Sequence, residues 1–412
     1  MTSGNSLDSG RRLCVLQVLP TFNPRYGGPV AAGAGISRSL NAHGIDVRLA
    51  SADGEADPAS FSPEQFDSDN SGRWGYCFRS RLFPIIRRLI NESDVVHVHG
   101  MWNFPASLAA KMAVYSGIPY VVSPHGMLTR WSLGQSVLKK RVYSFLAEQK
   151  NVRRASALHF FSEEEASTSE RWGSHARTVI IPNGVDAQEY DRRTAREEIG
   201  KFYPELIGKT LILFLGRLHP GKGIDLLVPA FGSLCSEFPA IRLVIAGPNA
   251  EYSGQMFELI RRFGIADRVM VTGLVTGERK RALLWGSDIF VLPSRHEGDS
   301  ISIKEALLAG LPIVITPQCN FALVEDANVG TVVELTIEGV TNGIRMLLVN
   351  PGMRTAMGFQ GSQLIRDRFT WDCIGRKFSE VYRELIDQRG ARFTSQSPKG
   401  KNKWPREEGC LT

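Results

Sequence analysis

The sequence has few of the features that mark secreted, membrane-spanning or metal-binding proteins. Its 412 residues include six cysteines, none in a Cys-x-x-Cys pair, so the spacing of zinc and redox sites is missing. Reduced cysteines are typical of the cytoplasm. The longest apolar runs, such as Leu211–Leu215, are strand-sized, so no transmembrane helix is predicted. The apolar run after Arg12 is too short for a signal peptide, and we expect a cytoplasmic protein.

Acidic residues are scarce in one part of the chain. The net charge is +7, and residues 70–160 hold thirteen Lys or Arg against three acids. A second basic run closes the chain, from Lys399 to Arg406. Nucleic acid or an anionic membrane could attract such surfaces, and a solvated basic face without a partner is the simpler interpretation of the tail. Arg79–Ile90 and Lys139–Leu146 mix bases with bulky apolar residues, which fits either peripheral membrane contact or core helices with basic outer faces.

Short apolar runs alternate with helix-length amphipathic segments. The runs are apolar nearly throughout, as in strands covered on both faces, so the alternation indicates an α/β fold with parallel sheets. The predicted strands are Leu13–Leu19, Val47–Ala50, Val95–Val98, Tyr120–Ser123, Ala157–Phe161 and Val179–Ile181, then Leu211–Leu215, Leu243–Ala246, Val269–Val271, Ile289–Leu292 and Ile313–Thr316.

The series of strands is interrupted near the middle of the chain. It stops before the charged segment Asp191–Lys209 and restarts near Thr210, which predicts two α/β units. Their boundary is placed near Ile181–Asp186, because Asn183-Gly184 is a strong turn signal. Ligands of such sheets bind outside the carboxyl ends of the strands, so the polar residues that follow strands are the candidates for a site.

Two cations follow the strand Leu211–Leu215 in a glycine-bearing loop that leads into a helix. Arg217 can bind phosphate oxygens bidentately, and Lys222 can act as a point charge. The N–H groups of the following helix would add donors. The loop suits a diphosphate, although an exposed turn with two solvated cations fits its spacing equally well.

Two carboxylates follow the strand Ile289–Leu292. Glu297 is predicted in a loop and Glu305 in a helix, Ser300–Ala309, that ends at Gly310. A helix carboxylate that faces a cleft can accept both hydroxyls of a ribose, and a loop carboxylate can accept sugar hydroxyls. The first turn of the helix attracts anions. In isolation, two acids that simply cap and solvate a helix would give the same pattern.

Together the two motifs resemble those of the retaining family 4 glycosyltransferases (glycosyl transferases group 1) of bacterial polysaccharide assembly, which have the GT-B fold. The resemblance runs from about Leu13 to about Arg389. Further landmarks of the family appear in the right order: Arg25-Tyr26-Gly27-Gly28-Pro29, His97-Val98-His99-Gly100, Ser123-Pro124-His125-Gly126-Met127 and Ile181-Pro182-Asn183-Gly184-Val185-Asp186.

The resemblance implies two Rossmann-like parallel-sheet domains that face a central cleft. Residues 1–190 would form the acceptor domain and residues 191–370 the nucleotide-sugar donor domain. Residues 371–389 would form a helix that returns to the first domain, and residues 390–412 a disordered basic tail.

The resemblance also implies roles for individual residues. Arg217 and Lys222 match the pair that neutralises the donor diphosphate. Glu305 matches the acid that binds the ribose, and Glu297 the acid near the sugar hydroxyls. His125 matches the active-site histidine. The residues expected to act in catalysis are His125, Glu297, Arg217 and Lys222, and those expected to bind the donor are Gly27, Gly28, Asp299, Ser300, Ile301 and Glu305.

The implied reaction transfers a hexose-type sugar, with retention, from a nucleotide diphosphate sugar to a hydroxyl of a saccharide or lipid-linked saccharide. No cofactor and no metal are expected, because fixed cations can stabilise the leaving diphosphate. Polysaccharide or glycolipid assembly would place the enzyme in the cytoplasm, with peripheral contact to the inner face of the membrane as a further option.

Some residues depart from the family or need another explanation. The family often has an aromatic residue where Asp299 stands, and this extra negative charge near the sugar leaves the donor sugar open. His97 and His99 point to one face of a strand. A hydrogen-bonded His97 and a cleft-edge His99 fit better than a metal pair. Asp67-Ser68-Asp69 matches a short metal motif, but it lies in an acidic loop.

Three other functions stay open. A GT-B nucleotide-sugar epimerase would share the site, and so would a noncatalytic sugar-nucleotide binding protein. Nucleic-acid binding is not expected. An NAD-dependent oxidoreductase is disfavoured because Ala32-Gly33-Ala34-Gly35 falls inside the predicted first helix, away from the strand–helix turn of a dinucleotide fold.

Overall fold

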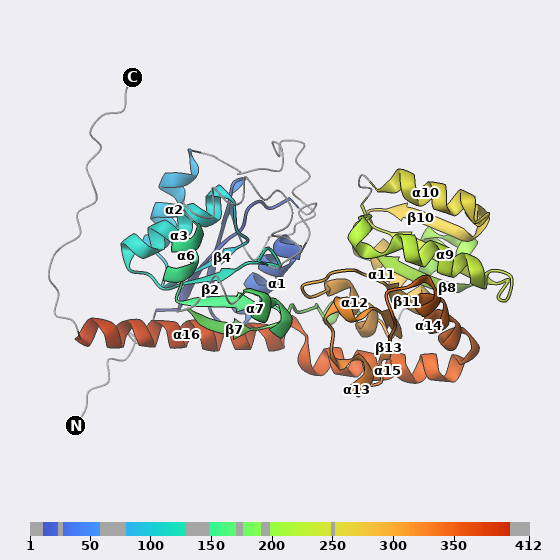
Figure 1. Cartoon of the computed structure of the whole chain (residues 1–412). Helices are drawn as coiled ribbons and strands as arrows, with labels where there is room; N and C mark the ends of the chain where they lie inside the picture. Colours follow the sequence, from blue (N-terminus) through green and yellow to red (C-terminus); the bar gives the residue numbers. More distant parts are fainter. Residues whose placement is uncertain are drawn as a thin grey trace, which may run out of the picture.

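The structure is a computed structural model that describes residues 11–23, 28–57, 80–128, 148–169, 176–190, 198–248 and 252–395. Within these residues the chain forms two α/β domains side by side (Figure 1). Both predicted strand series are present, so the expected fold of two parallel-sheet domains is confirmed.

The first sheet has seven strands in the order β3-β2-β1-β4-β5-β6-β7. Every neighbouring pair is parallel except β2 and β3, which form an antiparallel edge hairpin. The strand order reverses between β1 and β4, and such switch points are where open α/β sheets bind ligands. The strands are β1 (Cys14–Val18), β2 (Asp46–Ser51), β3 (Gly54–Ala56), β4 (Val95–His99), β5 (Tyr120–Ser123), β6 (Ala157–Phe160) and β7 (Arg177–Ile180).

The second sheet has six parallel strands in the order β10-β9-β8-β11-β12-β13, with its switch point between β8 and β11. The strands are β8 (Thr210–Leu215), β9 (Ile241–Ala246), β10 (Val269–Gly273), β11 (Ile289–Leu292), β12 (Ile313–Ile315) and β13 (Gly330–Val332). The short edge strands β3 and β13 are additions that the apolar pattern does not predict.

Helices connect the strands of both sheets (Figure 1). In the first domain they are α1 (Gly28–Ala42), α2 (Leu82–Asn91), α3 (Phe104–Ser116), α6 (Gln149–Arg154) and α7 (Glu163–Ser169). In the second they are α8 (Ile199–Phe202), α9 (Ile224–Leu234), α10 (Ser253–Arg262), α11 (Gly277–Gly286), α12 (Ile301–Leu308), α13 (Leu323–Asp326), α14 (Ile337–Val349) and α15 (Pro351–Arg368). No helix within the described ranges is long and apolar enough to cross a bilayer.

The chain passes between the domains twice, first near Val185 and again near Phe369–Trp371. These two crossings are hydrogen-bonded to each other. The Val185 N–H donates to the Phe369 carbonyl (2.9 Å), and the Trp371 N–H donates to the Val185 carbonyl (3.0 Å). Val185 and Tyr190 pack in the core of the second domain, so this core takes in residues that the predicted range 1–190 assigned to the first. The connection between the domains therefore consists of two chain segments that are hydrogen-bonded side by side.

After the second crossing, α16 (Trp371–Ser395) runs along the first domain, as expected for a returning helix (Figure 1). It continues past the predicted end at residue 389, and residues 396–412 lie outside the described part. Small residues let α16 approach α1: a Cβ on Gly35 would lie 2.0 Å from the Trp371 ring. Gly35 is inside α1, which confirms that Ala32–Gly35 is a helix-packing segment rather than a dinucleotide loop.

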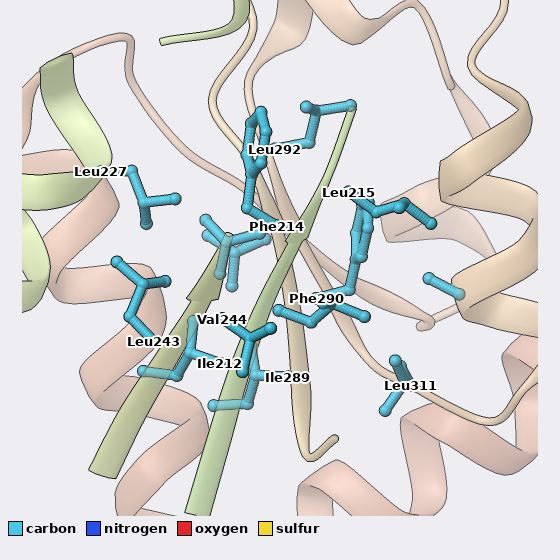
Figure 2. Packing of buried hydrophobic residues seen from close by; sticks show 14 of the residues in the cluster. Ile212, Phe214, Leu215, Leu227, Leu243, Val244, Ile289, Phe290, Leu292 and Leu311 are labelled. Carbon is cyan, nitrogen blue, oxygen red and sulfur yellow. The ribbon is translucent and has the colours of Figure 1, made fainter. Parts of the chain in front are cut away.

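Each domain buries its own apolar core. In the second domain, side chains from β8, β9 and β11 interleave with those of the flanking helices and of the loop before β12 (Figure 2). Phe214 and Phe290 from adjacent strands are completely buried there. These rigid sheets hold the carboxyl ends of β8 and β11, and the loops that follow them, in fixed positions.

Candidate active site between the two domains

A cavity of about 450 Å³ lies between the domains, at the two switch points. The start of α1, the β5–α6 connection and the loop after β6 contribute from the first domain. Nine of the ten predicted site residues line it: Gly28, His125, Arg217, Lys222, Glu297, Asp299, Ser300, Ile301 and Glu305. The tenth, Gly27, lies outside the described residues. The structure therefore brings together residues from four separate segments of the sequence.

The loop after β8 is shaped by Gly223. Its backbone is left-handed (φ 70°), and a Cβ there would lie 1.9 Å from the Pro293 carbonyl oxygen at the end of β11. Only glycine allows this approach. His219 caps the short 3₁₀ turn Pro220–Lys222, because its Nδ1 accepts from the Gly221 N–H (3.0 Å). Lys222 is thereby held at the edge of the neighbouring loop.

The loop after β11 is bonded to the loop after β8. The Ser294 hydroxyl and the Arg295 N–H both donate to the Gly221 carbonyl, at 2.9 and 2.7 Å. The Arg295 guanidinium binds both carboxylate oxygens of Asp225 on α9, at 2.8 and 2.6 Å. The two loops therefore form one unit, which keeps Lys222 and Glu297 at a fixed spacing.

Two lysine–carboxylate pairs face the cavity. Lys222 Nζ lies 2.5 Å from Glu297 Oε1, and Lys280 Nζ lies 2.8 Å from Glu305 Oε1. The second lysine, on α11, was missed by the sequence reasoning, since no local motif marks it. Arg217 is exposed and forms no ion pair with any residue that the structure describes. The wall formed by the second domain is thus charged and partly solvated.

Helix α12 presents its first turn to the same cavity. It begins at Ile301, one residue after the predicted start, with Ser300 as an extended N-cap whose side chain makes no capping bond. Glu305 lies one turn further along and is mostly buried, with its side chain 14% exposed. Ser300 and Ile301 therefore offer backbone N–H groups, and Glu305 offers a carboxylate, to one ligand.

Asp299 does not add a free negative charge to the cavity, which corrects the expectation from the sequence. Both of its carboxylate oxygens lie 2.6 Å from Nζ of Lys304, which is completely buried. Asn183 joins this pair: its N–H donates to Asp299 Oδ2, its side-chain amide donates to the Asp299 carbonyl, and its own carbonyl accepts from Lys304. The Asp299–Lys304 pair therefore fastens the first crossing to the second domain.

His125 faces the second domain from the opposite wall. Its backbone is left-handed (φ 54°), and the turn is held by Glu165, which accepts from the Gly126 N–H (2.5 Å) and the Phe161 N–H (2.9 Å). Burial raises the pKa of Glu165. His125 Nε2 lies 2.9 Å from Nδ1 of His99.

The other two histidines of interest lie behind His125. His99 is completely buried and does not reach the cleft, so the expected cleft-edge position is wrong; it contacts the cavity only through His125. His97 is packed and hydrogen-bonded as expected, between Tyr382 Oη and Ser123 Oγ, both at 2.6 Å. Burial lowers the pKa of His99 to about 3 and holds those of His97 and His125 well below the usual range.

Two further predictions concern metal and membrane. Among the residues described, no group of three or more His, Cys, Asp or Glu could hold a metal ion, and Asp67-Ser68-Asp69 lies outside them. Within Arg79–Ile90, the described helix α2 buries Leu82 and Ile86 and exposes Arg87 and Arg88, as a core helix with a basic outer face does. Lys139–Leu146 lies outside the described residues, and membrane contact stays a prediction.

Comparison with known proteins agrees with this geometry. A model of Glycosyltransferase Family 4 matches residues 26–189, and a model of Glycosyl transferases group 1 matches residues 195–363. The chain belongs to this glycosyltransferase family. It is an enzyme that transfers a sugar from a nucleotide-sugar donor, and the noncatalytic alternative falls away.

Two curated relatives share 26% and 28% sequence identity with this chain. The GDP-mannose:cellobiosyl-diphosphopolyprenol alpha-mannosyltransferase of Xanthomonas oryzae pv. oryzae is 26% identical over 90% of this chain and 97% of its own length. The GDP-mannose-dependent alpha-(1-6)-phosphatidylinositol monomannoside mannosyltransferase of Mycobacterium tuberculosis is 28% identical over 72% and 78%.

Solved structures show the same fold. The sucrose-phosphate synthase of Thermosynechococcus elongatus has a TM-score of 0.70 at 16% identity, covering 92% of this chain and all of its own. Anabaena HepE in complex with UDP and glucose has a TM-score of 0.69 at 18% identity, covering 90% and 100%. At these identities the likeness bears on the fold alone.

Proposed function

We propose that this glycosyltransferase moves a hexose, with retention of the anomeric configuration, from a nucleoside diphosphate hexose to a hydroxyl of a saccharide or lipid-linked saccharide. The observation that carries the proposal is that two cations, Arg217 and Lys222, and two carboxylates, Glu297 and Glu305, line one cavity opposite His125. An epimerase would need the same donor site, so the acceptor reaction decides between the two.

In this proposal the diphosphate of the donor takes the place of Glu297 as the partner of Lys222. A diphosphate is an alternative partner for Lys222, which now binds Glu297 at 2.5 Å. Glu297 is then released to accept hydroxyls of the sugar, and Glu305, oriented by Lys280, accepts the hydroxyls of the ribose. The N–H groups at Ser300 and Ile301 would face the phosphates, where the dipole of α12 favours negative charge.

The chemistry follows from where charge develops. As the sugar–phosphate bond lengthens, the leaving diphosphate gains negative charge, and Arg217 and Lys222 stabilise it without any reorganisation. Because these cations are built into the loop, we propose that turnover does not require a metal ion. The acceptor hydroxyl attacks on the face of the leaving phosphate, which takes its proton. Closure of the two domains excludes water and limits hydrolysis.

GDP-mannose is the first donor to test, because curated relatives over most of this chain carry that donor in their names. Their names also specify lipid-linked acceptors, a phosphatidylinositol mannoside and a diphosphopolyprenol. A lipid-linked acceptor would bring the first domain to a membrane surface. The exposed side chains of Phe83, Arg87 and Arg88 on α2 are the described residues proposed to meet it, in a cytoplasmic enzyme whose described cysteines are all free.

The test uses the full chain and a panel of GDP, UDP and ADP sugars. Ligand binding raises the melting temperature, so the donor that gives the largest shift identifies the base and sugar. That donor is then incubated with a polyprenyl-linked saccharide, and the anomer of the product is read by NMR. Transfer with retention supports the proposal. Epimerised donor without transfer, or an inverted product, contradicts it.

A further inference from the structure

His125 is the end member of a continuous series of hydrogen bonds through the interior of the first domain. The series, here called the histidine network, runs from the Ile181 carbonyl through His159, Ser123, His97, Tyr382, Gln17 and His99 to His125. Every side chain between the two ends is completely buried. The network begins at the first crossing, two residues before Asn183, and passes through Tyr382 of α16, the helix that follows the second crossing.

The direction of each hydrogen bond can be worked out from the Ile181 end. A carbonyl oxygen only accepts, so His159 donates to it from Nε2 (2.7 Å). The Nδ1 of neutral His159 must then accept, and it accepts from the Ser123 hydroxyl (2.6 Å). Having used its proton, Ser123 accepts from His97 Nε2 (2.6 Å), which leaves His97 Nδ1 as an acceptor. Each ring thus carries its proton on Nε2.

The remaining hydrogen bonds, from His97 to the cavity, have the same direction. Tyr382 donates its hydroxyl proton to His97 Nδ1 (2.6 Å), so its oxygen accepts from the Gln17 amide nitrogen (3.3 Å). This fixes the orientation of the Gln17 amide. Its carbonyl oxygen accepts from His99 Nε2 (2.5 Å). The Nδ1 of His99 therefore accepts from His125 Nε2 (2.9 Å).

We propose that the histidine network fixes His125 as the Nε2–H tautomer, so that its Nδ1 lone pair is the ring atom that accepts a hydroxyl hydrogen bond from substrate. His99, Gln17 and Tyr382 are the positioning residues nearest to His125. The hydrogen bond made by one ring nitrogen sets the protonation of the other. In all seven hydrogen bonds the donor lies on the side of His125 and the acceptor on the side of Ile181. The Ile181 carbonyl, which can only accept, therefore determines that the free nitrogen of His125 is Nδ1.

Two features support a neutral network. Each buried ring has one donor and one acceptor role to fill, and a second proton would place two hydrogens between neighbouring groups. Burial also lowers the pKa of His159 to about 4 and that of His99 to about 3, so both rings are neutral near pH 7. Because His125 then presents an acceptor, it is suited to a sugar or acceptor hydroxyl and unsuited to a phosphate oxygen, which the cations of the opposite wall serve.

The first experiment reads the tautomers directly. In the full chain labelled with ¹⁵N at histidine, a long-range ¹H–¹⁵N correlation spectrum at pH 7.5 separates protonated from unprotonated ring nitrogens. We expect four histidines with protonated Nε2 and bare Nδ1, assigned by the loss of one signal in each single His→Gln variant. An Nδ1–H tautomer or a doubly protonated ring at any of these four positions overturns the assignment.

The second experiment measures the effect on turnover, and this arm rests on the proposed function. Tyr382→Phe removes one hydroxyl from the middle of the network. Tyr120→Phe is the matched control, because Tyr120 is equally buried in the same domain and donates to the Asn151 carbonyl outside the network. We expect Tyr382→Phe to lower kcat about tenfold relative to Tyr120→Phe, the effect of misplacing one hydrogen bond, with donor KM little changed.

The outcomes separate the two proposals. Mixed tautomers at His99 and His125 in Tyr382→Phe, together with the lower kcat, support the network as a positioning device. An unchanged ring spectrum, or a kcat equal to that of Tyr120→Phe, overturns it. If wild type transfers no sugar from any donor, the proposed function fails, and the tautomer result still decides the assignment.

Discussion

The two walls of the cavity organise polar groups in opposite ways. The first-domain wall is neutral: His125 is hydrogen-bonded to the buried histidine network behind it, and burial keeps the pKa values of these histidines low. The second-domain wall is charged: Lys222 and Lys280, which are partly exposed, pair with the carboxylates of Glu297 and Glu305. A neutral wall can orient a sugar without competing for the diphosphate, and a charged wall can hold the diphosphate and exchange partners. We propose that diphosphate binding belongs to the second domain and orientation of the sugar to the first.

The largest expected effect is on the acid stability of the first domain. The ordinary histidine pKa is 6.5, whereas in the fold those of His99 and His159 are about 3 and 4. Below pH about 6.5 these histidines are protonated in the unfolded chain but stay neutral in the folded domain. The free energy of unfolding therefore falls as the pH drops, by up to about 1.4 kcal/mol per pH unit and per histidine. For His99 and His159 this predicts a loss of about 4–5 kcal/mol between pH 6.5 and 4.5, and the lowered pKa values of His97 and His125 add to it.

Hydrogen exchange as a function of pH measures this difference between the domains. Burial raises the pKa of Glu148 and Glu165 in the first domain, and these carboxyls oppose the trend near their own titration range. The amides of β4 and β5 should lose protection at a higher pH than those of β8 and β11. Loss of protection in the second domain first would show that the neutral wall is not the acid-sensitive one.

The next largest effect concerns the buried pair that fastens the first crossing. Lys304→Met leaves the carboxylate of Asp299 without its buried partner and should cost about 3–5 kcal/mol in the free energy of unfolding. Asp299→Asn combined with Lys304→Met removes both charges and should recover most of that loss. Urea denaturation of both variants tests the pair, and a double variant no more stable than the single one would contradict it.

The charged wall predicts a selective loss of activity. Lys222→Ala should lower kcat/KM by about 10²-fold or more, because the cation acts on charge that grows in the transition state. The melting temperature should fall less than in Lys304→Met, because Lys222 is 21% exposed and water can reach Glu297 in its place, whereas Lys304 is completely buried. Lys201→Ala, on the surface of the same domain, is the control. Full activity in Lys222→Ala would remove the phosphate-binding role.

The smallest effect is expected where an ion pair lies on the surface. Arg345 Nε lies 3.0 Å from Glu237 Oε2, and both side chains are more than a third exposed. Arg345→Ala should change the free energy of unfolding by less than about 0.5 kcal/mol and leave kcat unchanged. A loss comparable to that of Lys304→Met would mean that burial is not what separates structural pairs from solvated ones.

The sequence predicts what is encoded locally. Uniformly apolar strands, and a helix closed by Gly310, are properties of a few consecutive residues, and every strand except the edge strands β3 and β13, as well as α12, was predicted to within a few residues. The strand–loop–helix rule also placed Arg217, Lys222, Glu297 and Glu305 after two strands that prove to be neighbours. Their shared cavity follows from that topology.

Contacts between distant residues were not predictable in the same way. Tyr382 meets His97 across 285 positions, and Asn183 meets Asp299 across 116, so no local pattern links them. The correction at Asp299 shows the consequence: its charge looked free because its partner Lys304 becomes buried only when the first crossing packs against α12. Lys280 was missed for the same reason, since it reaches Glu305 only through the packing of the second domain.

The division of labour between the two walls can be tested by measuring two quantities on the same two variants. The affinity for the nucleoside diphosphate and the kcat for sugar transfer are determined for Lys222→Ala and Tyr382→Phe. We expect Lys222→Ala to lose diphosphate affinity, and Tyr382→Phe to keep the wild-type affinity and lose kcat. Diphosphate binding as weak in Tyr382→Phe as in Lys222→Ala, or as tight in Lys222→Ala as in wild type, would contradict this division.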